Sequence, residues 1–463
     1  MTLKRCSALF VLVLAAIAAD HPKSTPLDTF IHAPDPAFRY EFVKTITGDG
    51  YTAFVLQLTS QSWPPAAELT DRPIWKHWLT VIKPDRVEGS TGFLFITGGS
   101  VKDAAPTRVD AGNLETALAT HTIVAELRNV PNEPLVFKEE GKSRNEDGII
   151  AYTWVKFLKT GDPTWPLHFP MAKATIRAMD AVTQFCATEQ AGRLKIEKFV
   201  VGGASKRGWT TWLTAAADPR VVAFVPLVID TLNTEVSFNH HYRAYGFYSP
   251  AVKDYEEMGV MEMAGTPKYR ELMRLEDPYS YRERYTVPKF IINSGGDQYF
   301  LPDSSQFYFD GLPGEKYLRY VPNTDHSLRN SDARDSLIAF YDAVLHNRPR
   351  PRFTWKFEKD GRITVKCADE PSEVKLWQAT NPDKRDFRLE ALGPAYKSTP
   401  LTARSRGVYE AAIVKPAKGW TAAFIELTFP SGGKYPFKFT TAVRITPDTL
   451  AFPLPKPSGK LPD

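Results

Sequence analysis

The sequence predicts an α/β fold with a mostly parallel sheet, followed by a smaller domain of β-strands. Over residues 78–346, apolar runs of strand length alternate with segments whose apolar residues recur at helical spacing, which is typical of strand–helix units in a parallel sheet. After residue 352, short alternating runs are separated by turn residues, as in an immunoglobulin-like β-sandwich. A length of 463 residues also favours two domains.

The first domain is expected to begin with antiparallel strands. Residues 38–45 and 52–60 alternate around Gly48-Asp49-Gly50, which is a hairpin signal. The apolar runs that follow predict strands over residues 78–82, 93–96, 122–127, 199–204, 221–229, 289–293 and 317–321. Helical spacing predicts helices over residues 148–158, 171–186, 209–217 and 331–346.

Residues 231–285 break this alternation and are rich in Tyr, Phe, Met and Arg. We expect a helical cap inserted over a pocket here; a packed helical insertion that does not touch substrate is the alternative. The first domain then spans residues 19–348, and the prolines of residues 349–352 indicate a linker. The β-sandwich is expected over residues 353–445, with strands at 353–357, 362–367, 373–378, 408–413, 421–428 and 434–440, before a Pro-rich tail over 446–463.

Ser205 lies in the most informative segment of the chain. The run of residues 199–204 ends in three small residues, and a helix is expected directly after the serine. A strand, a tight turn and a helix around one serine form a nucleophile elbow, which exposes the serine hydroxyl above a sheet. The match to G-x-S-x-G is imperfect, because Arg207 takes the place of the second glycine and Gly208 comes one residue later.

An acid and a histidine follow Ser205 in the order that such hydrolases use. Asp297 and His326 each lie in a loop directly after a predicted strand, and sites in parallel sheets gather at these strand ends. The histidine would take the serine proton and the carboxylate would orient the imidazole. Asp230, which ends the preceding strand, is the rival acid. Asp303 and Asp325 are weaker rivals that fit a helix cap and a turn.

The developing oxyanion of such a reaction needs preorganised donors, usually backbone N–H groups. The N–H of Lys206, directly after the nucleophile, is one candidate. The other lies at Gly98 and Gly99, in the loop after the strand at residues 93–96, where esterases place their second donor.

Three further residues are candidates for substrate binding. Arg207 either binds a substrate carboxylate or pairs with a structural acid. His240 and His241 lie in the aromatic insertion, where they either line the pocket or are satisfied loop histidines.

The sequence also resembles the PhoPQ-activated pathogenicity-related proteins, which include the autocrine proliferation repressor proteins of social amoebae. Besides the Ser205 elbow, the resemblance rests on L-T-S-Q-S-W at 58–63, D-R-P-I-W-K-H-W at 71–78, E-D-G-I-I-A-Y-T-W at 146–154, G-D-Q-Y-F-L-P-D at 296–303, P-G-E-K-Y at 313–317 and N-T-D-H-S-L at 323–328. It extends from about residue 27 to beyond residue 440. It implies an α/β-hydrolase fold and no particular substrate. The elbow with an arginine and a shifted glycine is also similar to that of glucuronoyl and acetyl-xylan esterases, a resemblance that implies ester hydrolysis and keeps Asp230 open as the acid.

Composition limits the other function classes. The net charge is +5 and there is no long basic run, so nothing suggests nucleic acid. The sequence holds no H-E-x-x-H, no C-x-x-C and no nucleotide-binding glycine pattern between a strand and a helix, and we expect no metal and no cofactor. Cys186 and Cys367 are compatible with one disulfide or with two free thiols.

The N-terminus predicts export. Lys4 and Arg5 precede an apolar segment at residues 8–16, and Ala16-Ile17-Ala18 is a plausible cleavage site. Residues 1–18 are therefore expected to be a signal peptide, which predicts a secreted or periplasmic protein with no membrane span after cleavage.

Together these patterns predict a secreted serine hydrolase, an esterase that acts through an acyl-enzyme on Ser205 with a small-molecule ester or acylated substrate. The alternative is a secreted signalling or binding protein on a hydrolase scaffold, with weak or no catalysis and a partner at the cell surface. A peptidase is a third interpretation.

Overall fold

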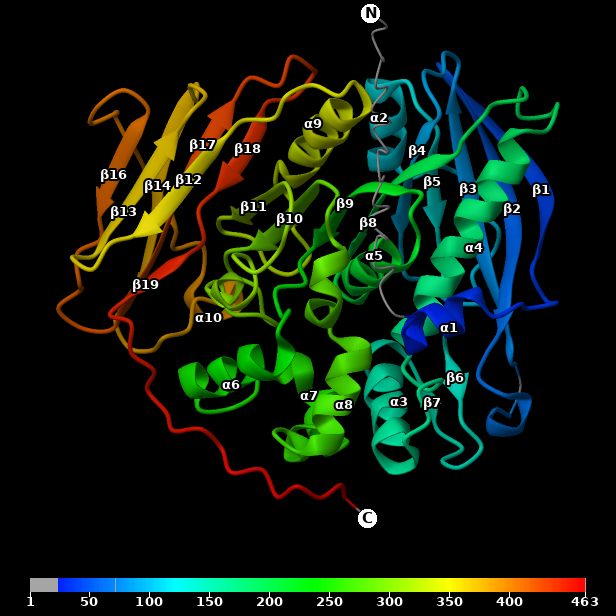
Figure 1. The fold of residues 1–463 in the computed structure, drawn as a ribbon, viewed down its shortest axis with the longest axis horizontal. Coiled ribbons are helices and arrows are strands. Elements are labelled where there is room, and N and C mark those ends of the chain that lie inside the picture. Colours follow the sequence, from blue (N-terminus) through cyan, green and yellow to red (C-terminus); the bar gives the residue numbers. More distant parts are fainter. Residues whose placement is uncertain (1–23, 71, 463) are drawn as a thin grey trace, which may run out of the picture.

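The computed structural model describes residues 24–70 and 72–462. A nine-stranded sheet crosses the first domain (Figure 1). Its first three strands are antiparallel, and β5, β4 and the strands from β8 to β11 run parallel to one another. From one edge to the other the strands are β1 (Arg39–Gly48), β2 (Tyr51–Ser62), β3 (Ile74–Pro84), β5 (Val124–Leu127), β4 (Thr91–Ile96), β8 (Lys198–Ala204), β9 (Val221–Leu227), β10 (Lys289–Ser294) and β11 (Lys316–Val321). The predicted α/β-hydrolase fold is confirmed.

Helices cover both faces of this sheet. One face carries α1 (Pro26–His32), α4 (His168–Cys186) and α5 (Lys206–Ala217), and the other carries α2 (Ala111–Thr120) and α9 (Ala333–Leu345). Each face has its own apolar core, because the strands are buried on both sides. Helix α2 was not predicted, because its buried face is mostly polar: the buried positions are Asn113, Thr116, Ala117 and Thr120.

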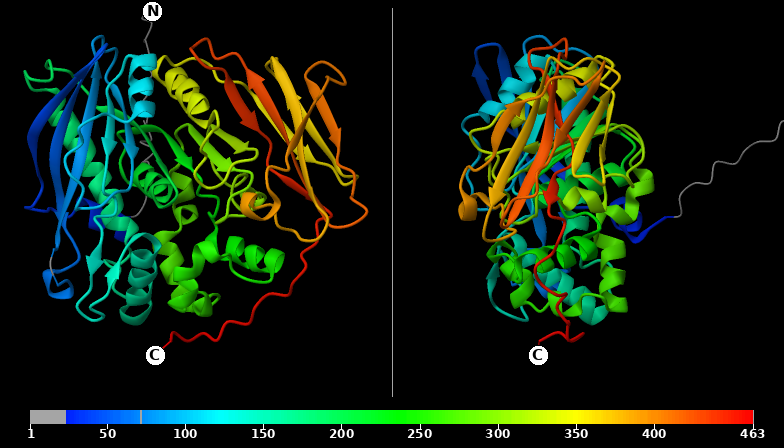
Figure 2. Two further views of the ribbon diagram at one scale, coloured as in Figure 1. Left: turned by 180° about the vertical axis from the view of Figure 1, so that it is seen from behind. Right: turned by 90° about the vertical axis from the view of Figure 1, so that its left-hand side faces the viewer.

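The insertion after β9 forms the predicted helical cap. It lies at the end of the sheet where β8, β9 and β10 finish, next to helix α3 (Glu146–Thr160) (Figures 1 and 2). Its elements are α6 (Thr234–Tyr245), η2 (Pro250–Val252), α7 (Lys253–Glu257), η3 (Met261–Met263), α8 (Pro267–Glu276) and η4 (Pro278–Arg284). The short elements elsewhere in the first domain are η1 (Ala66–Glu68), β6 (Leu135–Val136), β7 (Ser143–Arg144) and η5 (Ser304–Phe307).

The C-terminal part forms two antiparallel sheets, consistent with the predicted β-sandwich. One sheet holds β12 (Phe353–Phe357), β13 (Arg362–Cys367) and β16 (Val408–Ala412), and the other holds β14 (Glu373–Asn381), β15 (Lys397–Pro400), β17 (Trp420–Phe429), β18 (Phe437–Thr440) and β19 (Arg444–Thr446). β15, β19 and the short helix α10 (Leu389–Leu392) were not predicted. Every residue of β15 is exposed, so it has no apolar alternation that would reveal it.

The β-sandwich packs directly on the edge strand of the large sheet. Phe439 of β18 stacks on Tyr317 of β11 with ring centroids 4.3 Å apart and meets Phe290 of β10 at 5.2 Å. The Tyr320 N–H donates to Thr440 Oγ1 at 3.0 Å. The two parts of the chain therefore share one continuous apolar core.

The sequence left open whether Cys186 and Cys367 form a disulfide, and it predicted a signal peptide. Cys186 is buried and Cys367 half-buried, and both are free thiols. The predicted signal peptide lies outside the described residues. Among the described residues, no helix is both long and apolar enough to span a bilayer.

Candidate active site

Ser205 lies at the junction between β8 and α5. Its φ of 59° and ψ of −129° fall in a region that residues with a side chain rarely adopt. The Ser205 N–H donates to Leu227 O at 2.9 Å, and its carbonyl accepts from the Trp209 N–H at 3.0 Å. These bonds hold the strained turn between the neighbouring strand and the first turn of the helix. The serine is half-buried and lines a pocket.

Two glycines explain the unusual spacing of the motif. A Cβ atom at Gly203 would lie 2.6 Å from Arg207 O, and one at Gly208 would lie 2.9 Å from Leu227 O. Both distances are too short for a side chain unless the backbone moves. The crowding that requires the second glycine therefore falls at position 208, and position 207 has room for an arginine.

Asp297 and His326 are in direct contact. His326 Nδ1 lies 2.8 Å from Asp297 Oδ2 and 3.0 Å from Oδ1. The Tyr299 N–H donates to Asp297 Oδ1 at 2.7 Å, and the Tyr299 ring lies 4.3 Å from the His326 ring. Within the described chain, the buried Nε2 atom of His326 has no hydrogen-bond partner. A carboxylate on Nδ1 leaves Nε2 as the atom that can exchange a proton.

The rival carboxylates have other partners. Asp230 accepts hydrogen bonds from Tyr308 Oη at 2.7 Å and Tyr320 Oη at 2.5 Å, and burial raises its pKa to about 8. Asp303 Oδ2 lies 2.6 Å from an Arg385 guanidinium nitrogen, and Asp325 accepts from Ser327 in a turn. Of the carboxylates considered from the sequence, Asp297 is the one that bonds to His326.

The expected oxyanion donors come from the start of α5 and from the loop after β4. Lys206 is the first residue of α5, so its N–H has no partner in the helical ladder. The loop after β4 packs on the Arg207 side chain, because a Cβ atom at Gly98 would lie 2.5 Å from one of its guanidinium nitrogens. Gly99 has a φ of 132°, a conformation for which glycine is suited.

Arg207 pairs with a structural acid. Its guanidinium forms two hydrogen bonds to Glu146, of 2.9 and 2.7 Å. Lys206 Nζ lies 2.6 Å from the same carboxylate and 3.2 Å from Asp147 Oδ2. Burial opposes ionisation of the Glu146 carboxyl group, but the two cations outweigh this effect and hold the pKa of Glu146 well below its usual range. Burial next to Glu146 raises the pKa of Glu133 to about 8. The Lys206 and Arg207 side chains thus anchor the turn that carries Ser205.

His240 and His241 do not line the pocket at Ser205. His240 Nε2 lies 3.0 Å from Asp303 Oδ2. His241 Nε2 accepts from the Ser249 N–H at 2.9 Å, and burial lowers the pKa of His241 to about 3. The structure therefore gives both histidines structural partners in and beside the cap, in place of the predicted contact with substrate.

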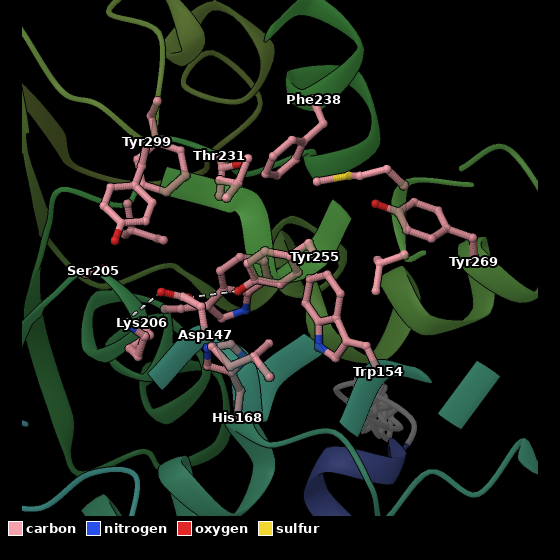
Figure 3. Close-up of a pocket in the computed structure, with 17 residues that line it drawn as sticks. Asp147, Trp154, His168, Ser205, Lys206, Thr231, Phe238, Tyr255, Tyr269 and Tyr299 are labelled. Atoms are coloured by element: carbon pink, nitrogen blue, oxygen red, sulfur yellow. Dashed lines mark hydrogen bonds and ion pairs between the residues drawn. The ribbon is translucent and has the colours of Figure 1, made fainter. Parts of the chain in front are cut away.

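The pocket is formed between the sheet and the cap (Figure 3). Its free volume is about 30 Å³, room for roughly two water molecules. Asp147 accepts from Tyr255 Oη at 3.0 Å and pairs with Lys206, which places one charged pair in a largely apolar wall. The lining residues are Asp147, Ile150, Trp154, His168, Ser205, Lys206, Trp209, Ile229, Thr231, Phe238, Val252, Tyr255, Val260, Met261, Tyr269, Tyr299 and Phe300.

The family model of the PhoPQ-activated pathogenicity-related proteins matches residues 27–388. The chain belongs to this family. The matched range contains Ser205, Asp297 and His326 and every residue of the pocket. The chain is also 38% identical to autocrine proliferation repressor protein A of Dictyostelium discoideum, over 96% of this chain and 95% of that protein.

Solved structures with a similar arrangement are distant in sequence. Acetyl xylan esterase 1 from Thermoanaerobacterium is 13% identical, with a TM-score of 0.47 over 69% of this chain and 92% of that one. An S-formylglutathione hydrolase from Agrobacterium tumefaciens is 14% identical, with a TM-score of 0.40 over 66% of this chain and 98% of that one. These similarities are too distant to bear on the chemistry of this family member.

Sequence reasoning missed several residues of the site. Glu146 and Asp147 start a helix whose apolar spacing was recognised, but nothing in the sequence pairs them with Lys206 and Arg207, about 60 positions later. His168 and Trp154 also line the pocket, although neither was proposed as a site residue. Among residues 24–70 and 72–462, no three His, Cys, Asp or Glu side chains come together in a way that could hold a metal ion.

Proposed function

We propose that this protein is a serine hydrolase that cleaves a carboxylic ester through an acyl-enzyme on Ser205. The observation that carries the proposal is the Asp297–His326 pair, in which His326 Nε2 has no partner among the described residues. Together with Ser205, these residues follow one another along the chain in the order of a catalytic triad. Two further features support it: the strained backbone of Ser205 and the apolar pocket that the serine lines.

In the proposed reaction, His326 Nε2 takes the hydroxyl proton while Ser205 Oγ attacks the carbonyl carbon of the ester. Backbone N–H groups of Lys206 and of the loop at Gly98 and Gly99 would stabilise the oxyanion. The bond to the alcohol oxygen then breaks, and His326 returns the proton to that oxygen. Water attacks the acyl-enzyme in the same way and releases the acid. Asp297 keeps the hydrogen on Nδ1 throughout.

Labelling with a fluorophosphonate, followed by intact-mass analysis, tests the proposal. We expect one adduct on the native protein and none on Ser205→Ala or His326→Ala. Ser398→Ala is the matched control, because Ser398 lies in the exposed strand β15, and it should label like the native protein. Absence of an adduct on folded native protein would contradict the proposal. Hydrolysis rates measured with ester substrates and with peptide substrates distinguish an esterase from a peptidase.

A second candidate function is that of a secreted signalling protein with little or no catalysis. It is favoured by the name of the relative that is 38% identical, a proliferation repressor. A cell-proliferation assay with purified Ser205→Ala protein decides between the two. Full activity of that variant would favour signalling through a cell-surface partner, and loss of activity would favour a role of the hydrolase chemistry. Mass spectrometry of the exported protein tests cleavage near residue 18.

A further inference from the structure

The pocket beside Ser205 contains two buried polar atoms that lack a partner. Trp154 and His168 both line it, and their side chains are only 3% and 1% exposed. Across the described residues, neither Trp154 Nε1 nor His168 Nε2 has a hydrogen-bond partner. Figure 3 shows both side chains on one side of the pocket, with Phe238, Thr231 and Tyr299 on the other. Buried polar atoms are rarely left unpaired, so these two require an explanation.

The His168 ring is fixed in orientation. Its Nδ1 atom lies 2.6 Å from Glu276 Oε2, at the end of cap helix α8, and the ring stacks on Trp209 with centroids 4.8 Å apart. Because an ionised carboxylate only accepts hydrogen bonds, Nδ1 carries the hydrogen. In the neutral ring, Nε2 then presents a lone pair and acts as an acceptor.

The Trp154 indole ring is also held in place by its neighbours, and its nitrogen is a hydrogen-bond donor. Its ring lies 6.0 Å from Trp209 and 5.3 Å from Tyr255, measured between centroids. The indole Nε1 atom can only donate. With the imidazole neutral, the pocket therefore contains one donor and one acceptor of fixed orientation in a largely aromatic and aliphatic wall.

We propose that these two atoms form a subsite for a hydroxyl group of the substrate. A hydroxyl both accepts and donates, so one oxygen can accept from Trp154 Nε1 and donate to His168 Nε2. A carbonyl oxygen would satisfy the tryptophan alone, and an ammonium group the histidine alone. The free volume of about 30 Å³ limits the entering group to a short chain. This subsite rests on the proposed function, because the chain that enters it belongs to the ester that Ser205 attacks.

Matched pairs of esters test the subsite and locate the hydroxyl. The first pair, methyl 3-hydroxybutyrate and methyl butyrate, differs by a hydroxyl group in the acyl half of the ester. The second pair, 3-hydroxybutyl acetate and butyl acetate, differs by a hydroxyl group in the alcohol half. We expect native kcat/KM to favour the hydroxylated member of one pair by about tenfold, the order of one or two hydrogen bonds. The ratio should fall toward one in Trp154→Phe and in His168→Asn, whose amide nitrogen retains a donor to Glu276.

Trp377→Phe is the control, because Trp377 Nε1 is also buried and unpaired but lies in the β-sandwich. It should keep the native ratio. Equal rates within both pairs, or a preference that survives in both pocket variants, would overturn the subsite.

A readout that needs no turnover separates this proposal from the proposed function. In Ser205→Ala, the indole N–H resonance of Trp154, assigned by its loss in the additional Trp154→Phe variant, should move downfield with a hydroxylated ester and not with its plain partner. The same shift with both members of each pair would contradict the subsite. A selective shift in a protein whose native form does not label with fluorophosphonate would support the subsite and contradict the hydrolase.

Discussion

Asn323 and Tyr396 form a reciprocal pair of hydrogen bonds between the two domains. Asn323 Nδ2 donates to Tyr396 O, and the Tyr396 N–H donates to Asn323 Oδ1, both at 2.9 Å. Asn323 lies three residues before His326, and Tyr396 lies just before β15 of the β-sandwich. The loop that carries the histidine is therefore held by the second domain.

The loop that carries Asp297 is held in the same way. The Leu389 N–H, at the start of α10, donates to Gly296 O at 2.9 Å. A Cβ atom at Gly296 would lie 3.0 Å from that same Leu389 nitrogen, so the segments are closely packed. The β-sandwich thus contacts the residue next to Asp297 and the loop of His326, and we infer that it positions both.

Removal of the Asn323 side chain tests this positioning. Asn323 has a φ of 55°, so Asn323→Gly deletes the side chain without forcing the backbone out of a left-handed conformation. We expect kcat and the rate of fluorophosphonate labelling to fall about tenfold with KM little changed, because a small displacement of a catalytic group lowers the rate strongly. Asn330→Gly is the control, since Asn330 is exposed and has a φ of 57°. Equal rates in the two variants would contradict the positioning role.

Asp297→Asn and Asp230→Asn separate the two carboxylates. Asp297 bonds to His326 and Asp230 to two tyrosines. Loss of the acid that orients the histidine should lower kcat by about four orders of magnitude. Asp230→Asn should retain kcat within about tenfold, because an amide can replace a protonated carboxyl group. The measurement is steady-state ester hydrolysis, and the reverse order of effects would assign the role to Asp230.

Asp230 also predicts how stability depends on pH. Its pKa is raised to about 8 in the folded protein from 3.8, so the folded state binds a proton that the unfolded state has lost. Its contribution to stability is complete below about pH 4 and is lost as the pH rises toward 8. Asparagine does not titrate, so the Tm of Asp230→Asn relative to native protein should increase by a few degrees from pH 5 to pH 8. A difference in Tm that is constant with pH would contradict the raised pKa.

Ser205, Asp297 and His326 could be singled out from the sequence because each follows an apolar strand of a parallel sheet, and the structure pairs Asp297 with His326. The sequence could not choose between Asp297 and Asp230, since β10 and β9 are neighbours and each is followed by an aspartate shortly after its last residue. The difference lies in the tyrosines that surround Asp230, which come from residues 308 and 320. Contacts of that sequence separation leave no local periodicity.

Large separation along the sequence also explains why other contacts of the site were not predicted. His168 and Glu276 are 108 positions apart and meet only when the cap has packed on α4. The contact of Leu389 with Gly296 joins the start of a four-residue helix to a loop, and neither segment carries a hydrophobic pattern from which a contact could be predicted. Helices α3, α4, α5 and α9, the succession of the main strands along the chain and the elbow were predictable because they depend on local periodicity and turn chemistry.

The C-terminal tail lies along the cap (Figures 1 and 2). The Phe452 N–H donates to Arg243 O in α6 at 3.0 Å, and the Gly459 N–H donates to Glu262 O in η3 at 2.8 Å. The Ser458 N–H adds a bond of 2.7 Å to the Glu262 carboxylate. One extended segment therefore ties together two separate elements of the cap.

Truncation after residue 449 should loosen the cap. The cap forms much of the pocket wall, and loss of these bonds lets its helices separate from the sheet more often. We expect a lower Tm, faster hydrogen exchange in α6 and η3, and a higher relative kcat/KM for long-chain esters that the narrow pocket otherwise excludes. Lys456→Ala, at an exposed tail position, is the control and should match the native protein. An unchanged ratio of long-chain to short-chain ester hydrolysis in the truncated protein would show that the tail does not restrict access to Ser205.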